Sequence, residues 1–406
     1  MSVDLRTRTD HETITVDPSR FFTTELPAAL DRAGELIARG AGFLRLRPLT
    51  IEVGGELWSL RRNGKCGVLR GALSEAAHLR LSADELGELV HDQKTPMTFF
   101  TGGTLDMPSG GLRDFLDWWL VMRAALDRRP LYVPGSVAFA DREGEPLDLR
   151  RSFRSDDSVE EMSHFLHEAG YLHIAGVFSE EEMGRVATDM DRAAASYSDG
   201  DGRSWWVTTS DGRRRLVRMQ TFNEHSPTTD GILHDERFLR LGAIPGDGHV
   251  HTGLEGNPIE ALVKPLGVVE GISDVPWHKD CSLGRHSYEC CSMTAGISVT
   301  GADAVSGQLR VVAGSHRALI WPALQQPGRD LPEVDLPTRT GDVTIHLSCT
   351  LHMSQPPQER ERRVMYTSFR LPAMASAARL EARARVRAVR EAAHTTVSQE
   401  PATQTK

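Results

Sequence analysis

The strongest constraint on the fold is a series of short apolar segments in the second half of the chain. Within each segment, apolar residues either alternate with polar ones or follow one another over the length of a strand. Glycines and prolines separate the segments, which are Met293–Val299, Gln308–Val312, Val343–Leu347 and Val364–Phe369. Segments of this length and spacing are typical of antiparallel β-strands. We therefore expect the chain after Trp205 to form a β-sandwich or jelly roll.

The first third of the chain has a different pattern, in which helical and strand-like segments are mixed. Leucines and alanines between Leu26 and Ile37 recur at helical spacing, and strand-like residues follow at Ile51–Leu60 and Cys66–Leu69. Ser82 and Glu85 have the spacing of a capping box. A last helix, Leu112–Leu126, has a wide apolar face that we interpret either as packed core or as the wall of a cavity for an apolar ligand.

Residues 77–119 carry a resemblance to a known module. The stretches His78-Leu79-Arg80-Leu81-Ser82-Ala83-Asp84-Glu85-Leu86 and Pro96-Met97-Thr98-Phe99-Phe100-Thr101-Gly102-Gly103-Thr104-Leu105 resemble the lipid-binding sterol carrier type-2 domain. The resemblance covers about residues 21–130. It implies a small α+β module with an apolar tunnel.

These patterns divide the chain into five parts. We expect a flexible arm (1–20), a sterol-carrier-like domain (21–135), a linker (136–156), a β-rich domain (157–372) and a helical and disordered tail (373–406). Ser158 and Ser179 each precede a predicted amphipathic helix that leads into the β-rich domain.

Composition narrows the possible partners and the compartment. The 406 residues carry a net charge of −9, which disfavours nucleic acid as a partner. No apolar run is long enough to span a membrane, and the start lacks the pattern of a signal peptide. Five cysteines without framework spacing indicate reduced thiols. We expect a cytoplasmic protein.

A candidate metal site lies between two predicted strands. His278 and Asp280 stand two residues apart, so on a strand end both side chains point to the same side, and His352 comes from a later strand. Two imidazoles and one carboxylate are the ligand set of non-haem Fe(II) oxygenases, which leave open positions for a cosubstrate and dioxygen. The tripeptide alone is not specific, because His234-Asp235-Glu236 has a similar spacing.

The order of motifs around these residues is more specific. The motifs are Val275-Pro276-Trp277-His278-Lys279-Asp280, Ser306-Gly307-Gln308-Leu309-Arg310-Val311-Val312-Ala313-Gly314-Ser315-His316, Gly341-Asp342-Val343-Thr344-Ile345-His346, His352 and Arg362-Arg363. Over about residues 157–372 this resembles the phytanoyl-CoA dioxygenase family of Fe(II)/2-oxoglutarate oxygenases. The resemblance implies a double-stranded β-helix of the jelly-roll or cupin-like type with flanking helices.

The resemblance also implies roles for individual residues. His278, Asp280 and His352 become the iron ligands, and Arg362 or Arg363 holds the distal carboxylate of 2-oxoglutarate. Strand alternation allows only one of the two arginines to point inward, and the sequence leaves both open. Lys264 and Gln220 are further candidates for the cosubstrate pocket. No catalytic residue beyond the metal ligands is expected, with His316 and His346 as supporting or core groups.

Other metal-binding patterns are weaker. Cys281, Cys290 and Cys291 lack paired zinc spacing and are expected to be structural thiols. His249 and His251 are expected in an exposed loop that binds no metal. Retention of Asp280 favours hydroxylation over halogenation, which needs a site vacated by the carboxylate.

We therefore expect a dioxygenase that uses Fe(II), 2-oxoglutarate and O2 to hydroxylate an unactivated C–H bond. Its substrate is a small molecule, expected to be apolar, such as an acyl chain, a sterol or a natural product. The alternatives are a hydroxylase of a free amino acid or small polar metabolite, in which the N-terminal module serves dimerisation, and a non-catalytic lipid-binding protein.

Overall fold

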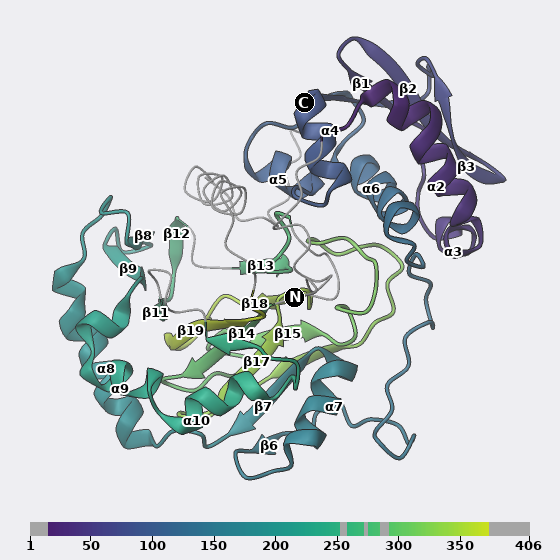
Figure 1. Cartoon of the computed structure of the whole chain (residues 1–406). Helices are drawn as coiled ribbons and strands as arrows, with labels where there is room; N and C mark the ends of the chain where they lie inside the picture. Colours follow the sequence, from purple (N-terminus) through teal and green to yellow (C-terminus); the bar gives the residue numbers. More distant parts are fainter. Residues whose placement is uncertain (1–14, 252–257, 272–274, 285–291, 373–406) are drawn as a thin grey trace.

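The computed structural model describes residues 15–251, 258–271, 275–284 and 292–372. They form two layered parts: an N-terminal module with one sheet and its helices, and a larger part with two sheets (Figure 1). This confirms the expected α+β module followed by a β-core. The helical and disordered tail expected for residues 373–406 and the cysteines Cys290 and Cys291 lie outside the described residues.

The N-terminal module is a five-stranded sheet with order β3-β2-β1-β4-β5, in which only the β1–β4 pairing is parallel. Its elements are η2 (Phe21–Glu25), α2 (Leu26–Arg32), α3 (Gly34–Ala38), β1 (Leu49–Val53), β2 (Glu56–Asn63), β3 (Lys65–Arg70), β4 (Ala77–Leu81), α4 (Ala83–Val90), α5 (Pro96–Thr101), β5 (Asp106–Ser109) and α6 (Leu112–Asp127).

Two local predictions for this module need correction. The segment Ile51–Leu60 is not one strand but a hairpin, because Gly54 and Gly55 both adopt positive φ (61° and 82°) and turn the chain between β1 and β2. The helix predicted from Leu26 to Ile37 is divided at Ala33. The capping box of Ser82 and Glu85 is present at α4.

Helix α6 is the central helix of the module. Its wide apolar face contributes Phe115, Trp118, Trp119 and Met122 to the N-terminal core, each at most 3% exposed. Of the two interpretations of this face, packed core is therefore the one observed. The resemblance to a sterol carrier domain stays a prediction.

The larger part contains two sheets that share one core. The major sheet has the order β12-β8-β9-β11-β19-β14-β17-β7-β6, with β10 beside β19, and the minor sheet has the order β13-β18-β15-β16. The strands are β6 (Phe153–Arg154), β7 (Tyr171–Ala175), β8 (Ser204–Thr209), β9 (Arg214–Met219), β10 (Val250–His251), β11 (Glu260–Lys264), β12 (Val268–Glu270), β13 (Val275–His278), β14 (Ser292–Ser298), β15 (Leu309–Val312), β16 (Glu333–Leu336), β17 (Val343–Leu347), β18 (His352–Ser354) and β19 (Arg362–Arg370).

Apolar side chains of both sheets meet between them. Val311 and Val334 of the minor sheet and Ile297 and Ile345 of the major sheet belong to the same core cluster. Two facing sheets of this kind, antiparallel except for the parallel pairing of β6 with β7, form the predicted jelly roll.

Capped helices cover the outer face of the major sheet (Figure 1). Ser158 caps α7 (Val159–Ala169), and Ser179 and Glu182 form a capping box at α8 (Glu180–Ala193), as the sequence predicts. The small helices α9 (Pro227–Leu233) and α10 (Glu236–Leu239) lie beside them. These helices leave the interior between the two sheets to the functional side chains.

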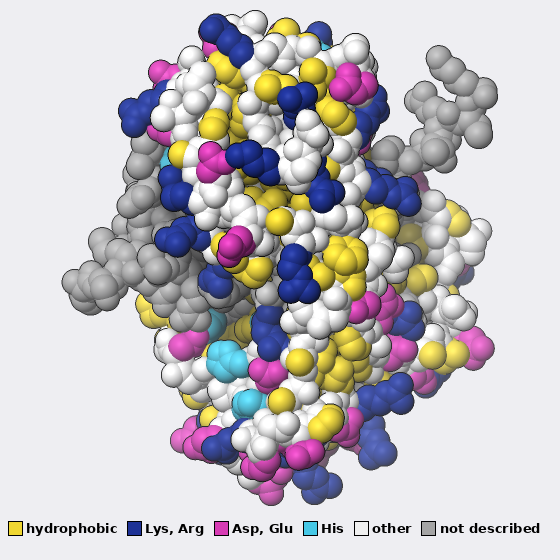
Figure 2. All heavy atoms as spheres, turned by 90° about the vertical axis from the view of Figure 1, so that its right-hand side faces the viewer, with side chains coloured by type: hydrophobic (Ala, Val, Ile, Leu, Met, Phe, Trp, Pro, Cys, Tyr) yellow, Lys and Arg dark blue, Asp and Glu magenta, His cyan; other side chains and the backbone are white. Residues whose placement is uncertain are grey.

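Two features concern possible partners: the distribution of charge on the surface and the length and polarity of the helices. Lysines and arginines are interspersed with acidic side chains over the face shown in Figure 2. Among the described residues, every helix is too short or too polar to cross a bilayer.

The proposed domain boundary in the linker 136–156 stays a prediction. Most core residues fall into one cluster before Leu131 and another after Phe153. However, Leu283, Leu319, Trp321, Ala323 and Leu324 of the larger part belong to the N-terminal core. The two parts therefore share a buried contact.

Candidate metal centre

The predicted iron ligands meet on two paired strands. His278 ends β13, Asp280 follows it by two residues, and His352 opens the antiparallel neighbour β18 directly opposite His278. One ligand atom from each of the three residues lies within 4.8 Å of the others. The Oδ1 atom of Asp280 is 3.7 Å from the Nε2 atoms of both histidines.

Backbone carbonyls fix both imidazoles in the tautomer that a metal requires. The Nδ1–H group of His278 donates to the carbonyl of Pro276 at 2.7 Å, and that of His352 donates to the carbonyl of Thr350 at 2.9 Å. Because a carbonyl can only accept, Nδ1 carries the proton in each ring and Nε2 keeps its lone pair. Both Nε2 atoms are therefore ready to coordinate a cation.

Two side chains hold the second oxygen of the Asp280 carboxylate. The Thr294 hydroxyl, on β14, donates to Oδ2 at 2.6 Å, and Nε2 of His346, on β17, lies 3.3 Å from the same oxygen. Oδ1, which faces the two ligand histidines, is left for a metal. The Asp280 side chain remains 31% exposed, so one side of the site is open.

Burial and neighbouring charges set the protonation states. Burial would raise the pKa of Asp280, but the imidazoles of His278, His346 and His352 hold it well below its ordinary value. Burial, together with His346 and His278, holds the pKa of His352 well below its ordinary value. The carboxylate is therefore charged and the His352 imidazole neutral, which are the forms that bind metals.

Arg362 is a buried cation in the interior of the barrel. It is 4% exposed, and its guanidinium donates to the carbonyl of Gly307 at 2.8 Å and to the hydroxyls of Ser354 at 3.0 Å and Tyr366 at 3.1 Å. These acceptors are neutral, and Nε of Arg362 is buried without a hydrogen-bond partner among the described residues. A buried guanidinium in such a setting favours an anionic ligand.

The position of Arg362 relative to the predicted metal ligands follows from strand geometry. Ser354, which accepts a hydrogen bond from Arg362, lies two residues after His352 on β18. The side chains of Ser354 and His352 therefore lie on one face of the strand, about 7 Å apart. Lys264 pairs with Arg362 across β11 and β19, is 3% exposed, and donates to the carbonyl of Ser354 at 3.4 Å. Arg362 and Lys264 thus form a buried cationic pair beside the ligand strand.

The other two cosubstrate candidates make different contacts. Arg363 points to the opposite side of β19, where it forms ion pairs with Asp191 at 2.8 Å and Glu361 at 3.1 Å. These contacts separate it from the barrel interior. Gln220 follows β9, where its carbonyl accepts a hydrogen bond from Tyr197 at 2.7 Å. Its role in the cosubstrate pocket stays a prediction.

The histidines His249 and His251 do not lie in an exposed loop. His249 is 6% exposed and its Nδ1 contacts Asp247 at 2.5 Å, while Nε2 of His251 contacts Thr367 at 2.8 Å. The expectation of an exposed loop was wrong, because Gly246 and Gly248 indicated a turn but not the burial of His249 or the pairing of β10 with β19. Cys281 packs against the larger core.

The sequence interpretation missed several residues of the site. Thr294, Ser354 and Tyr366 contact Asp280 or Arg362, yet none belongs to a recognisable motif. Their positions become visible only when the strand pairing is known.

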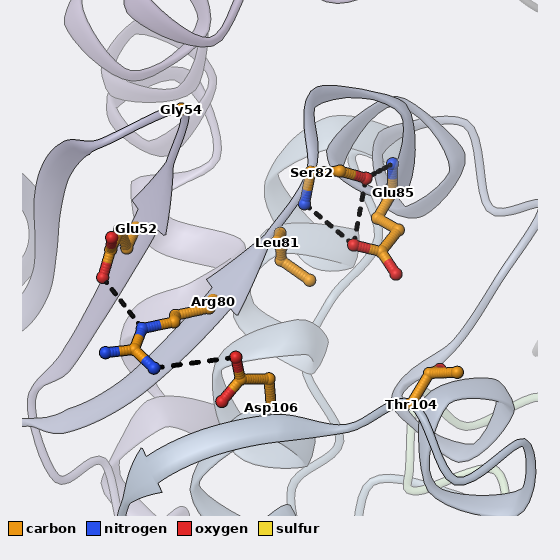
Figure 3. Close-up of a pocket in the computed structure, with 8 residues that line it drawn as sticks. All are labelled: Glu52, Gly54, Arg80, Leu81, Ser82, Glu85, Thr104 and Asp106. Carbon is orange, nitrogen blue, oxygen red and sulfur yellow. Dashed lines mark hydrogen bonds and ion pairs between the residues drawn. The ribbon is translucent and has the colours of Figure 1, made fainter.

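A separate polar hollow of about 290 Å³ lies on the N-terminal sheet (Figure 3). In it Arg80 pairs with Glu52 at 3.2 Å and with Asp106 at 3.7 Å, while Glu85 accepts hydrogen bonds from Ser82. These partners satisfy one another. The hollow is therefore a structural ion-pair cluster.

Comparison with protein families identifies the larger part. The family model for phytanoyl-CoA dioxygenase (PhyH) matches residues 166–364. These residues form a PhyH-family domain. The family consists of Fe(II)- and 2-oxoglutarate-dependent non-haem oxygenases, so the PhyH domain belongs to that enzyme class and uses Fe(II), 2-oxoglutarate and O2. A comparison with curated proteins found no match.

Several solved structures are similar to this chain. The non-haem α-ketoglutarate-dependent epimerase SnoN from nogalamycin biosynthesis is 19% identical, with a TM-score of 0.38 over 52% of this chain and 82% of that chain. HygX from Streptomyces hygroscopicus, with nickel and 2-oxoglutarate bound, is 18% identical, with a TM-score of 0.40 over 53% of this chain and 88% of that chain. EctD from S. alaskensis, with 2-oxoglutarate and 5-hydroxyectoine, is 16% identical, with a TM-score of 0.43 over 60% of this chain and 86% of that chain.

The residues of the PhyH domain fit the Fe(II) ion and the 2-oxoglutarate that the family uses. Two Nε2 lone pairs and one carboxylate oxygen converge from one side, as a 2-His-1-carboxylate ligand set requires. The unpartnered Nε of Arg362 and the buried Lys264 suit a dicarboxylate.

Proposed function

We propose that His278, Asp280 and His352 bind Fe(II), that Arg362 binds the distal carboxylate of 2-oxoglutarate, and that the enzyme hydroxylates an unactivated C–H bond of an apolar small molecule. The observation that carries the metal assignment is the pair of imidazoles whose Nδ1–H groups are bound to backbone carbonyls on either side of a charged carboxylate. Such fixed tautomers are typical of metal ligands.

When bound, iron with 2-oxoglutarate activates dioxygen for oxidation of the substrate. The residues of the chain supply orientation. Arg362 offers its guanidinium to the distal carboxylate, which fixes the cosubstrate relative to His352 through their shared neighbour Ser354. Thr294 holds Oδ2 of Asp280 and so directs Oδ1 towards the ligand histidines. With Asp280 present as a third protein ligand, hydroxylation is favoured over halogenation.

The apolar character of the substrate rests on the resemblance of the N-terminal module to a lipid-binding domain. A carrier-like module would present an acyl chain, sterol or natural product to the PhyH domain. Native mass spectrometry of the full chain with fatty acids and sterols tests this part. If no apolar ligand binds while small polar metabolites stimulate succinate release, the substrate is polar.

The metal assignment is tested by His278→Ala, with His164→Ala as a matched control. Within the described part of the chain, Nε2 of His164 contacts the backbone carbonyl of Ala140, at 2.8 Å, away from the ligand group. We expect His278→Ala to weaken anaerobic Fe(II) binding about 100-fold or more and to abolish 2-oxoglutarate-dependent succinate release. The control should keep both. Full Fe(II) affinity in His278→Ala would refute the assignment.

A further inference from the structure

The segment that carries two of the three proposed metal ligands, the end of β13 and the residues that follow it, is weakly held by its own sheet. β13 is an edge strand of the minor sheet, and its pairing with β18 is interrupted by a register shift between Val275 and His278. Strand pairing alone therefore does not fix the segment that runs through His278 and Asp280.

A second segment, Leu319–Leu324, holds the other edge of β13. The amide of Lys279 donates to the carbonyl of Pro322 at 2.9 Å, and the amide of Leu324 donates to the carbonyl of Trp277 at 3.0 Å. His278 and Ala323 form a β-bridge. These contacts enclose the His278 backbone from the side opposite β18.

This second segment is itself anchored in the N-terminal module. Leu319, Trp321 and Ala323 are at most 4% exposed and belong to the N-terminal core. The indole Nε1–H of Trp321 donates to Oδ1 of Asp117, on α6, at 2.8 Å. Leu319 also pairs with Leu131 in a parallel bridge. The segment that backs β13 is thus anchored by N-terminal residues.

The chain after Asp280 docks on the same module. The hydroxyls of Thr95 and Thr98, at the start of α5, donate to the carbonyls of Ser282 and Leu283. Leu283 is 2% exposed in the N-terminal core. Gly284 packs so closely that a Cβ there would clash with the carbonyl oxygen of Gln93.

We propose that the N-terminal module is a positioning element of the iron site, which holds the segment Trp277–Gly284, and thereby His278 and Asp280, in the geometry that binds Fe(II). This inference rests on the proposed metal assignment. The two ligands lie between two anchored points, Trp277 and Ser282, so loosening either anchor leaves the ligands free to move apart. Figure 1 shows β13 on the side of the jelly roll that faces α5.

The decisive variant is Trp321→Phe, which keeps an aromatic ring but removes the donor to Asp117. Trp118→Phe is its matched control, because Trp118 is equally buried in the same core but donates within the module, to the carbonyl of Arg47 at 2.6 Å. Both variants lose one buried indole hydrogen bond. Only Trp321→Phe touches the backing of the metal strand.

Two measurements are made on each full-length variant: the dissociation constant for Fe(II) alone under anaerobic conditions, and amide hydrogen exchange of residues 275–284 in the metal-free protein. We expect Trp321→Phe to raise the Fe(II) dissociation constant about tenfold and to speed exchange in that segment. Trp118→Phe should leave both at the wild-type value. Equal effects of the two variants, or an unchanged Fe(II) affinity in Trp321→Phe, would overturn the proposal.

A second pair covers the case in which Trp321→Phe does not fold. Thr95→Val removes the hydroxyl that binds Ser282, and Thr95→Ser retains it. Weaker Fe(II) binding in the valine variant, with recovery in the serine variant, is expected; wild-type Fe(II) affinity in both refutes the coupling. The His278→Ala variant separates the two proposals. Full Fe(II) affinity in His278→Ala would refute the metal assignment. If His278→Ala loses Fe(II) affinity but the Thr95 and Trp321 variants do not, only the proposed role of the N-terminal module is refuted.

Discussion

At the scale of single residues, neighbouring groups set the protonation and the orientation of the proposed metal ligands. The sequence pattern predicts His278, Asp280 and His352, and these residues converge. It does not predict Thr294, because the contact between a hydroxyl on β14 and a carboxylate after β13 depends on how strands far apart in the chain are placed. The residues that orient ligands are therefore harder to predict than the ligands.

Thr294→Val should weaken Fe(II) binding while keeping side-chain volume. Loss of the 2.6 Å hydrogen bond lets the carboxylate of Asp280 rotate, and we expect a dissociation constant about tenfold higher by anaerobic titration. Thr294→Ser should restore binding. Thr367→Val serves as control, because its hydroxyl donates to the carbonyl of Pro258 at a similar 2.6 Å. Equal loss in Thr367→Val would argue against a specific role for Thr294.

The burial of His316 leads us to expect that the stability of the folded protein depends on pH. Burial lowers its pKa to about 3, so the folded protein keeps the imidazole neutral, whereas an unfolded chain titrates it near pH 6.5. The unfolded state therefore binds the extra proton, and stability from this residue is full above about pH 6.5 and falls as pH decreases towards 3.

The variant His316→Gln can keep the bond to the carbonyl of His167 without this titration. Between pH 7.5 and pH 5.0, urea unfolding of wild type should lose about 2 kcal/mol more than the variant. A difference between the two proteins that does not change with pH would contradict the prediction.

At the scale of elements, strand alternation decides what the sequence leaves open. β19 places Arg362 inside the barrel and Arg363 outside, against Asp191 and Glu361. The sequence predicts the strand and the adjacent arginines, but not the phase of the alternation, since both residues suit a strand start. The hairpin at Gly54 and Gly55 is a similar case, in which the strand residues are predicted and the turn between them is missed.

Arg362→Lys and Arg363→Lys should therefore differ in the Michaelis constant for 2-oxoglutarate. Lysine cannot form the two-point contact that a guanidinium makes with a carboxylate, so Arg362→Lys should raise this constant about 10- to 100-fold. Arg363→Lys should change it less than about twofold, because its contacts are surface ion pairs. Succinate release at varied 2-oxoglutarate measures both, and a larger effect at Arg363 would exclude Arg362 as the anchor.

At the scale of the whole molecule, the sequence predicts two parts but not the contact that they share. The change from mixed helical and strand patterns to short strands marks two cores, and both are observed. The burial of Trp321 and Leu283 in the N-terminal core could not be predicted, because nothing local distinguishes a side chain that packs in a neighbouring core from one in its own. The shared contact implies that the parts respond together to ligands.

Binding of Fe(II) and 2-oxoglutarate should accordingly stabilise the N-terminal module, although the proposed ligands lie outside it. At about 100 times the dissociation constant, a ligand adds about 2.7 kcal/mol to the folded state. Because Thr95, Thr98 and Asp117 hold the segments around His278 and Asp280, amides in α5 and α6 should exchange more slowly in the loaded protein. Amides of β3, at the far edge of the N-terminal sheet, should change less. Protection confined to the jelly roll would show that the two cores are energetically independent.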